Sequence, residues 1–310
     1  MIESFLTVSQ QVLMLFILIG VGFLLGKLKL LNAQGSLCMS NIMLYAVIPC
    51  LVVSSFQRPL QADQLQNFGL TIALSLAVHV LMIAISAVVL RRADDDRRSI
   101  LCLCAVMANC GFMAFPLQSA LYGSLGVFYG SGYMIIFNIC TWTYALYMAA
   151  GADRSVLKLR TLLLNPTIIS LALAMVLYLG EITLPDLLLT PINYIASLNV
   201  PVPMIIIGFH LSQADLKSAI RGKGTLTSLV LRLVVSPLLA LGLCLLLGLD
   251  AMVSTVVVIA ASTPAAAVVT MLVSKFGKNA PLSSSLVSIH TICSAITIPV
   301  MVALTQLVIR

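Results

Sequence analysis

The sequence predicts an all-α integral membrane protein with ten transmembrane helices, arranged as two inverted five-helix repeats. Three observations predict this fold. Of the 310 residues, 61% are hydrophobic and only 9% are charged. The charges gather in short clusters, and helix-breaking residues recur at corresponding places in the two halves. A soluble domain of this composition would have to expose large apolar patches.

Each uncharged stretch between the charge clusters can hold a membrane-spanning helix, because roughly 20 apolar residues cross the hydrocarbon layer. In chain order the stretches are 4–26, 30–57, 64–90, 99–152, 161–180, 187–214, 224–249, 251–274 and 279–309, with Arg232 as the one charge inside them. The stretch 99–152 is long enough for two helices, and Gly123, Ser124 and Gly126 mark the turn between them. The total is ten spans.

The distribution of basic residues predicts the orientation of these spans. Arg58 and Arg310 fall in the loops on one side of the membrane. The loops on the other side contain Lys27, Lys29, Arg91, Arg92, Arg97, Arg98, Arg154, Lys158, Arg160, Lys217, Arg221, Lys223, Lys275 and Lys278. Because basic loops stay in the cytoplasm, we expect both termini on the extracytoplasmic side, in a bacterial inner membrane. The net charge of +7 then reflects orientation in the lipid bilayer, and no nucleic-acid partner is expected.

Two copies of one unit account for the ten spans. Five is an odd number, so a second five-helix copy must enter the membrane from the opposite side, as inverted repeats do. The first repeat is 1–152, a short cytoplasmic linker is 153–164, and the second repeat is 165–310. Pro116 in the fourth span and Pro264 in the ninth occupy corresponding places.

These two prolines predict where a ligand binds. A proline inside a helix removes a hydrogen bond and costs about 3 kcal/mol, and in lipid the freed groups survive only within protein or along a cavity. Paired interruptions at corresponding places point to a transporter's binding site. We expect the broken fourth and ninth helices to cross at Pro116 and Pro264. Gly111 would let their backbones approach closely, and the positive helix ends at the crossing would favour an anion.

A family resemblance adds to this interpretation. The segment 109–116, NCGFMAFP, followed by Tyr122-Gly123, resembles the fourth helix of the auxin efflux carrier family, which includes plant auxin exporters and bacterial malate and malonate permeases. Further similar marks are Asn41 to Pro49, Asn165-Pro166, Arg232 to Pro237 and Pro264. The resemblance implies a scaffold of the first, second, sixth and seventh helices, often dimeric, so a homodimer through these helices is expected. The remaining helices, 3–5 and 8–10, would form a mobile transport unit.

Several polar residues inside the spans are candidates for the site, each with a structural alternative. Asn109 contacts the ligand or satisfies backbone freed by Pro116. Asn138 has polar counterparts in the site of the family that the chain resembles, and it could face the crossing. Asn41 either contacts the ligand or holds two helices together. The hydroxyl groups of Ser262 and Thr263, at the break of the ninth helix, either contact the substrate or cap free backbone groups. The predicted substrate-binding set is Asn41, Asn109, Gly111, Pro116, Asn138, Ser262, Thr263 and Pro264.

Ionisable groups within the spans are few. Arg232 lies nine residues past Lys223 and could extend to the cytoplasmic interface or attract substrate entering from inside. His79 and His290 are packed residues or members of a proton relay. No Asp or Glu occurs within any span, so the usual carboxylate machinery for coupling to protons or sodium is missing. The sequence offers no cofactor motif, metal-ligand spacing or catalytic group, and we do not expect an enzyme.

The predicted function is secondary transport of a small organic anion, a mono- or dicarboxylate, by alternating access around the helix crossing. An uncoupled carrier of this kind would export the anion, driven by the membrane potential. A sodium- or proton-coupled symporter of the bile-acid-carrier type is the alternative within the same class. A membrane sensor or receptor, or an intramembrane enzyme, is the alternative from other classes.

Overall fold

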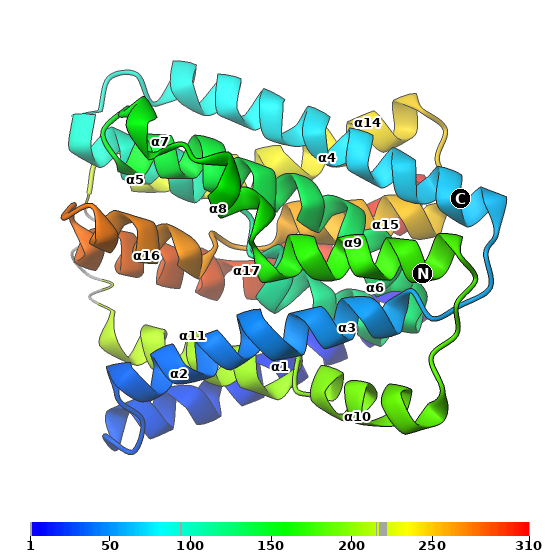
Figure 1. The fold of residues 1–310 in the computed structure, drawn as a ribbon. Coiled ribbons are helices and arrows are strands. Elements are labelled where there is room, and N and C mark those ends of the chain that lie inside the picture. Colours follow the sequence, from blue (N-terminus) through cyan, green and yellow to red (C-terminus); the bar gives the residue numbers. More distant parts are fainter. Residues whose placement is uncertain (1, 94, 215, 217–221, 310) are drawn as a thin grey trace.

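The structure, a computed structural model, describes residues 2–93, 95–214, 216 and 222–309. Lys217, Arg221 and Arg310, which enter the predicted charge distribution, lie outside these residues. The described chain is a bundle of helices that run side by side (Figure 1). Figure 1 places the start of the first helix and the end of the last at the same end of the bundle. This agrees with the prediction that both termini lie on one side of the membrane.

The first half of the chain comprises three helices with a π-turn, then one long uninterrupted helix, and then the interrupted helices of the fourth and fifth predicted spans. The elements are α1 (Ile2–Lys27), α2 (Ala33–Ile42), η1 (Met43–Val47), α3 (Ile48–Ser55), α4 (Ala62–Val89), α5 (Asp95–Val106), η2 (Cys110–Ala114), α6 (Phe115–Cys140), η3 (Thr141–Ala145) and α7 (Leu146–Ala149). The long helix α6 covers parts of two predicted spans and changes direction at Gly123, whose φ is 58° and ψ −144°. Glycine tolerates this conformation because it has no Cβ, and the predicted turn is confirmed.

The second half begins after a short linker. The elements are η4 (Arg154–Val156), α8 (Leu159–Leu163), α9 (Pro166–Leu179), α10 (Asp186–Ser197), α11 (Pro201–Gln213), α13 (Thr225–Val230), η5 (Leu231–Val235), α14 (Ser236–Leu246), α15 (Ala251–Ser262), α16 (Ala267–Lys275) and α17 (Ala280–Val308). Asn165 caps α9, as its Oδ1 accepts from the N–H groups of Thr167 and Ile168 at 2.9 and 3.4 Å. Proline follows in the first turn, where its missing N–H costs nothing.

The described residues contain seven helical stretches that are long and apolar enough to cross a membrane, and one of them, Cys110–Ala149, contains the turn at Gly123. Two further apolar helices, Pro166–Leu179 and Ala251–Ser262, are shorter. The protein is therefore a multi-pass membrane protein. The count of ten spans remains a prediction, because the fourth, sixth and ninth predicted spans consist of short or interrupted helices.

The predicted break at Pro116 is wrong in position. The interruption lies at 107–109, between α5 and η2, and the helix continues through Pro116 in the first turn of α6. The π-turn η2 explains the continuity: the N–H of Phe115 donates to the carbonyl of Cys110, five residues back. This wider turn accommodates a proline ring that would clash in a regular α-helix.

The same device recurs at two other prolines. The N–H of Ile48, just before Pro49, donates to the carbonyl of Met43, and the N–H of Ser236, just before Pro237, donates to the carbonyl of Leu231. In each case a π-turn ends two residues before the proline. A proline in these spans therefore widens the helix locally, and the chain keeps its direction.

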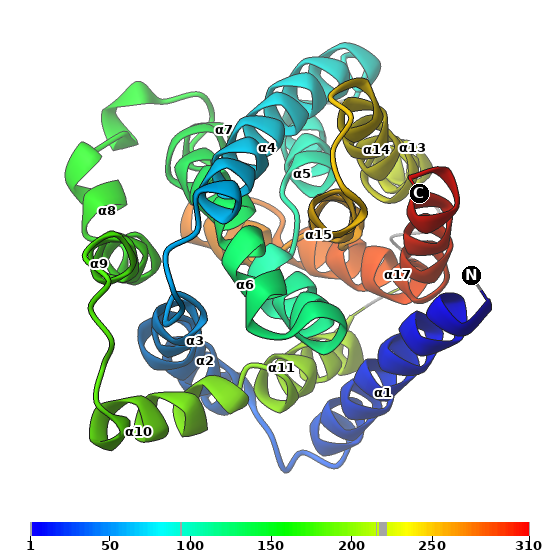
Figure 2. The ribbon, with the colours of Figure 1, turned by 90° about the vertical axis from the view of Figure 1, so that its right-hand side faces the viewer.

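Most of the helix packing lies within two groups. One contains α1, α2, α3, α9, α10 and α11; the other contains α4 to α7 and α13 to α17. The groups also touch each other, because α17 packs against α1 and α11, and α6 packs against α3. Figure 2 shows α10, α11 and α1 along one edge of the molecule, with α4, α5 and α14 at the opposite edge. The resemblance implied a scaffold of the first, second, sixth and seventh spans and a transport unit of the others, and that division stays a prediction. Whether the groups move as a scaffold and a transport unit stays a prediction.

Glycines set the closest helix contact within the first group. The helices α1 and α11 pack along most of their length, and a Cβ at Gly22 would collide with the carbonyl oxygen of Ile205. A Cβ at Gly208 would collide with that of Ile19. Small residues let backbones approach in this way in membranes, where packing, rather than hydrophobic burial, holds helices together.

We expect Gly208→Ala to separate α1 from α11 and to destabilise the protein by about 1–3 kcal/mol, the range for overpacking a filled interface. Thermal unfolding of the purified protein in detergent measures the effect. Gly20→Ala is the matched control on α1, because nothing lies within 4 Å of a Cβ there. Equal melting temperatures for Gly208→Ala and Gly20→Ala would contradict the role of this contact.

Candidate functional site

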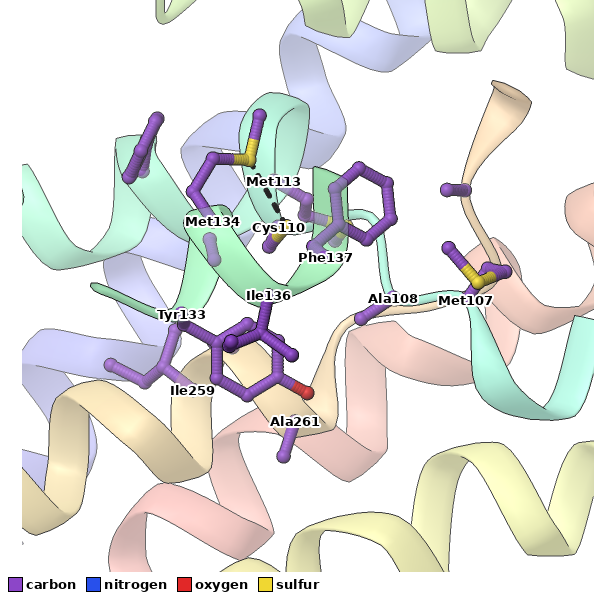
Figure 3. Close-up of a cluster of buried hydrophobic side chains, with 14 of the residues drawn as sticks. Met107, Ala108, Cys110, Met113, Tyr133, Met134, Ile136, Phe137, Ile259 and Ala261 are labelled. Atoms are coloured by element: carbon purple, nitrogen blue, oxygen red, sulfur yellow. Dashed lines mark hydrogen bonds between the residues drawn. The ribbon is translucent and has the colours of Figure 1, made fainter. Parts of the chain in front are cut away.

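The two interrupted helices meet at their breaks. The N–H of Asn109 donates to the carbonyl of Pro264, and the N–H of Ala266 donates to the carbonyl of Met107, both at 2.9 Å. These bonds pair Ala108 with Ala265 as an antiparallel bridge, and Figure 3 shows Met107 and Ala108 on this extended segment. Both alanines are fully buried. Extended backbone at membrane depth is tolerated because each segment supplies the other's hydrogen bonds.

Arg232 holds the carbonyl ends of the two first half-helices. Its Nη1 donates to the carbonyls of Val106 at 2.7 Å and Ala105 at 3.4 Å, at the end of α5. Its Nη2 donates to the carbonyl of Ala261, near the end of α15, and to the Oγ of Ser236 at 2.7 Å. The last carbonyls of a helix lack partners within it and carry partial negative charge, so the guanidinium satisfies both ends.

This position corrects one expectation. Arg232 is 1% exposed and bonds to carbonyls at the crossing, so its side chain does not extend to the membrane interface. It also does not line the large cavity described next. The guanidinium therefore acts on the two helix ends.

A cavity of about 840 Å³ lies on the side of the crossing opposite to Arg232. Its walls come from α2, η1, the start of α3, η2, the second part of α6, η3, α8, α9, α11, α16 and α17. The lining extends to Ala33, Arg160, Ser274 and Ala280, which adjoin the connections α1–α2, α7–α9 and α16–α17. These connections carry basic residues, so the cavity reaches the end of the bundle that the charge distribution places in the cytoplasm.

The first turns after both breaks line this cavity. Gly111 and Phe112 contribute from η2, and Ala267 and Val268 contribute from α16. The amide groups of a first helical turn lack partners within the helix, and a helix N-terminus carries partial positive charge. Two such ends converge on one space, an arrangement that attracts an anion.

The predicted asparagines also line the cavity. Asn109 is 5% exposed and lies at the start of η2. Asn138 lies on α6, and its Nδ2 donates to the carbonyl of Met134 at 2.9 Å. Asn41 lies on α2, in the opposite wall. The structure thus brings Asn41, Asn109, Gly111 and Asn138 together around one space.

The other four members of the predicted set do not line the cavity. The hydroxyl of Ser262 donates to the carbonyl of Val258 at 2.6 Å, and that of Thr263 donates to the carbonyl of Ala260 at 2.8 Å. These bonds match the backbone-capping alternative, and both side chains are fully buried. Pro264 belongs to the crossing itself, through its carbonyl, and Pro116 is buried in α6. In this conformation none of the four reaches a ligand in the cavity.

Two ionisable residues of the cavity were not among the sequence-predicted site residues. Arg160, from α8, and His210, from α11, are among its described lining residues, which include no Asp or Glu. A ring nitrogen of His210, Nε2, lies 3.4 Å from the Oγ of Ser36 on α2. The sequence signal for Arg160 was its place in a basic loop, and that for His210 was its place near the end of a span.

His79 and His290 do not line the cavity. His79 lies on α4, where its Nδ1 contacts the carbonyl oxygen of Ser75 at 2.8 Å and its ring packs against Tyr133, with 5.2 Å between centroids. His290 is fully buried on α17. Their suggested part in proton coupling stays a prediction.

The fold and the site define a class: a multi-pass membrane protein in which two interrupted helices meet beside a central cavity. The chain belongs to the membrane transport protein family, whose model matches it twice, over residues 7–161 and 154–302. This is the auxin efflux carrier-like family that the resemblance indicated.

Two archaeal relatives match nearly the whole chain. An uncharacterized transporter of Methanothermobacter thermautotrophicus is 25% identical over 301 residues, which cover 95% of this chain and 97% of the relative. An uncharacterized transporter of Methanocaldococcus jannaschii is 24% identical over 298 residues, which cover 93% of this chain and 95% of the relative.

The geometry predicts which positions water-soluble reagents reach. In a variant with Cys38, Cys50 and Cys293 replaced by alanine, the other five cysteines are buried. We expect a cysteine at Ala267, in the cavity wall, to react with a membrane-impermeant thiol reagent from the same side as one at Ser155, in the exposed linker.

Vesicles of opposite orientation distinguish the two sides. A cysteine at the buried Ser262 is the control and should stay unlabelled from either side. Labelling of position 267 from the side opposite to position 155 would show that the cavity opens at the other end.

Proposed function

We propose that this protein is a secondary transporter of a small organic anion, a mono- or dicarboxylate, that works by alternating access around the crossing. The observation that carries the proposal is the cavity on which two half-helix N-termini converge. Its described lining residues include Arg160 and lack any acidic side chain. A cavity of about 840 Å³ is within the usual range for small-molecule sites.

The lining residues suggest how such an anion would be held. A carboxylate can accept hydrogen bonds from the first-turn amides of η2 and α16, and the side-chain amides of Asn109 and Asn138 can orient it. Phe112, Trp142 and Tyr45 also line the cavity and offer apolar surface to the rest of the ligand. The carboxylate would supply the negative charge, and the protein would supply fixed dipoles.

At the opposite end of the bundle, aromatic side chains pack between the two helix groups. Phe56 at the end of α3 and Tyr178 on α9 pack against Phe128 of α6, with centroids 4.6 and 5.3 Å from that ring. The guanidinium of Arg58 lies over the Phe128 ring at 5.2 Å and donates to the Oγ of Ser124 at 2.7 Å. These contacts join the two helix groups, so separating them would open the far side. In the proposed cycle this conformation would be the inward-facing state, because the cavity reaches the end of the bundle that the charge distribution predicts to face the cytoplasm.

The driving force follows from the charge of the cargo. Moving one unit charge through 100 mV is worth about 2.3 kcal/mol, which favours an anion outside a negative cell interior by roughly fifty-fold. A carrier without a coupled ion would therefore export the anion. In this proposal the protein lies in the cell inner membrane with both termini outside, and it can form a homodimer through the α1–α3 and α9–α11 group.

Reconstitution in liposomes tests the function. We expect radiolabelled malate or malonate to leave protein-containing liposomes faster when an inside-negative potassium diffusion potential is imposed, without sodium or pH gradients. Potential-independent flux, or an absolute need for sodium or a pH gradient, would refute uncoupled export. No flux of any carboxylate in a panel of mono- and dicarboxylates would refute the organic-anion assignment.

Asn109→Ala should lower the apparent affinity in that assay about ten- to a hundredfold, since a hydrogen bond to a charged group is worth about 1.5–3 kcal/mol. Ser262→Ala is the matched control, because Ser262 lies beside the crossing without lining the cavity.

One observation favours a second candidate, proton-coupled transport. His210 lines the cavity, and a protonated imidazole would add a positive charge that strengthens anion binding. A proton could then bind in the cavity together with the anion and be released together with it on the other side of the membrane. The described lining residues include no carboxylate, the usual charged ligand of a coupling sodium ion.

The pH dependence of flux separates the two candidates. Proton coupling through His210 predicts that wild-type flux is faster at pH 5.5 than at pH 7.5 and that His210→Gln removes this difference. His79→Gln, a change outside the cavity, should preserve it. If wild-type flux is equal at the two pH values, proton coupling through His210 is excluded and the uncoupled carrier stands.

A further inference from the structure

Four oxygen atoms from three parts of the chain surround the guanidinium of Arg232. They are the carbonyl oxygens of Ala105 and Val106 at the end of α5, the carbonyl oxygen of Ala261 near the end of α15, and the hydroxyl of Ser236. The Ser236 hydroxyl is itself bonded to the Ala261 carbonyl at 3.2 Å. The cluster is fully buried, at the point where both helices are interrupted.

Carbonyl and hydroxyl oxygens are the ligands of hard cations, and broken helices of transporters coordinate sodium through their carbonyl ends. Charge balance supports the same conclusion. Each helix C-terminus carries roughly half a negative charge, so two such ends together match one positive charge. Arg232 supplies that charge permanently, because a guanidinium does not lose its proton in proteins.

We propose that Arg232 is a tethered cation that occupies an alkali-cation site between the two half-helix ends, and that removing its charge opens this site to sodium. The inference deepens the proposed function, on which its transport consequence rests. A coupling ion that dissociated in each cycle would leave the carbonyl ends unpaired in the empty carrier. A tethered cation keeps the crossing assembled in every state, so transport needs no ion gradient.

Melting temperature in different salts tests the site independently of transport. Wild-type protein should melt at the same temperature in sodium chloride and in choline chloride of equal ionic strength. Arg232→Ala should melt lower in choline and recover by about 5 °C in 0.2 M sodium chloride, because a bound ion stabilises the folded state by mass action. Millimolar guanidinium chloride should restore part of the loss. Arg154→Ala, which removes an exposed loop charge, is the control and should respond to none of these salts.

Two further variants keep the test decisive if Arg232→Ala does not fold. Arg232→Gln is neutral but retains a donor, so it should still gain stability from sodium. Arg232→Lys restores the charge, so it should be less stable than wild type but insensitive to the cation. Equal melting of the neutral variants in all salts would show a purely structural arginine and overturn the proposal, and so would a sodium requirement in the wild type.

Flux measurements then connect the site to function. In liposomes, Arg232→Ala or Arg232→Gln should acquire a dependence on sodium that wild type lacks. If wild type carries no organic anion but the neutral variants are stabilised by sodium, the proposed function fails and the cation site remains. If wild type carries the anion and the neutral variants show no response to sodium, the tethered cation fails and the transporter remains.

Discussion

The contact between Arg232 and the carbonyl ends of α5 and α15 is the interaction on which the rest of the site depends. Interrupting two helices at membrane depth leaves carbonyl groups that cannot reach water, and each would be costly if unpaired. The guanidinium bonds to carbonyls of both ends, and the bridge between Ala108 and Ala265 satisfies the segments between the half-helices. Arg232 neutralises the negative C-terminal ends of α5 and α15 on one side of the crossing. The positive N-terminal ends of η2 and α16 then face the cavity on the other side. The polarity of the site follows from this separation.

The two helix groups are held together by different kinds of contact. In one group, α1 and α11 touch through backbone at Gly22 and Gly208, a contact that leaves no space for adjustment. The crossing in the other group is held by hydrogen bonds of backbone and arginine. Between the groups lie the cavity at one end, the aromatic contacts of Phe128 at the other, and the packing of α17 against α1 and α11. The proposed change of access would have to break these contacts between the groups.

Much of the fold followed from local patterns. The uncharged stretches predicted the helices, Gly123 predicted the turn within 99–152, and Asn165 before a proline predicted the start of α9. The corresponding breaks predicted a crossing, and the structure has one. Its position within the fourth span was wrong, because a π-turn absorbs Pro116 and the chain opens at 107–109, where no proline occurs. Ser262 and Thr263 were close to the crossing in sequence, but their hydroxyls bond to carbonyls of their own helix.

The sequence by itself determined that the chain is a multi-pass membrane protein and where its helices run, because hydropathy, charge and turn residues act locally along the chain. It also led to the family and to the asparagines that line the cavity. Only the tertiary structure decided the partners of Arg232, because they are backbone carbonyls, which every residue has and no side chain marks. It likewise decided that His210 faces the cavity whereas His79 does not. The direction of a side chain around a helix that is apolar on all sides depends on which neighbours pack against it, and that packing is a property of the whole bundle.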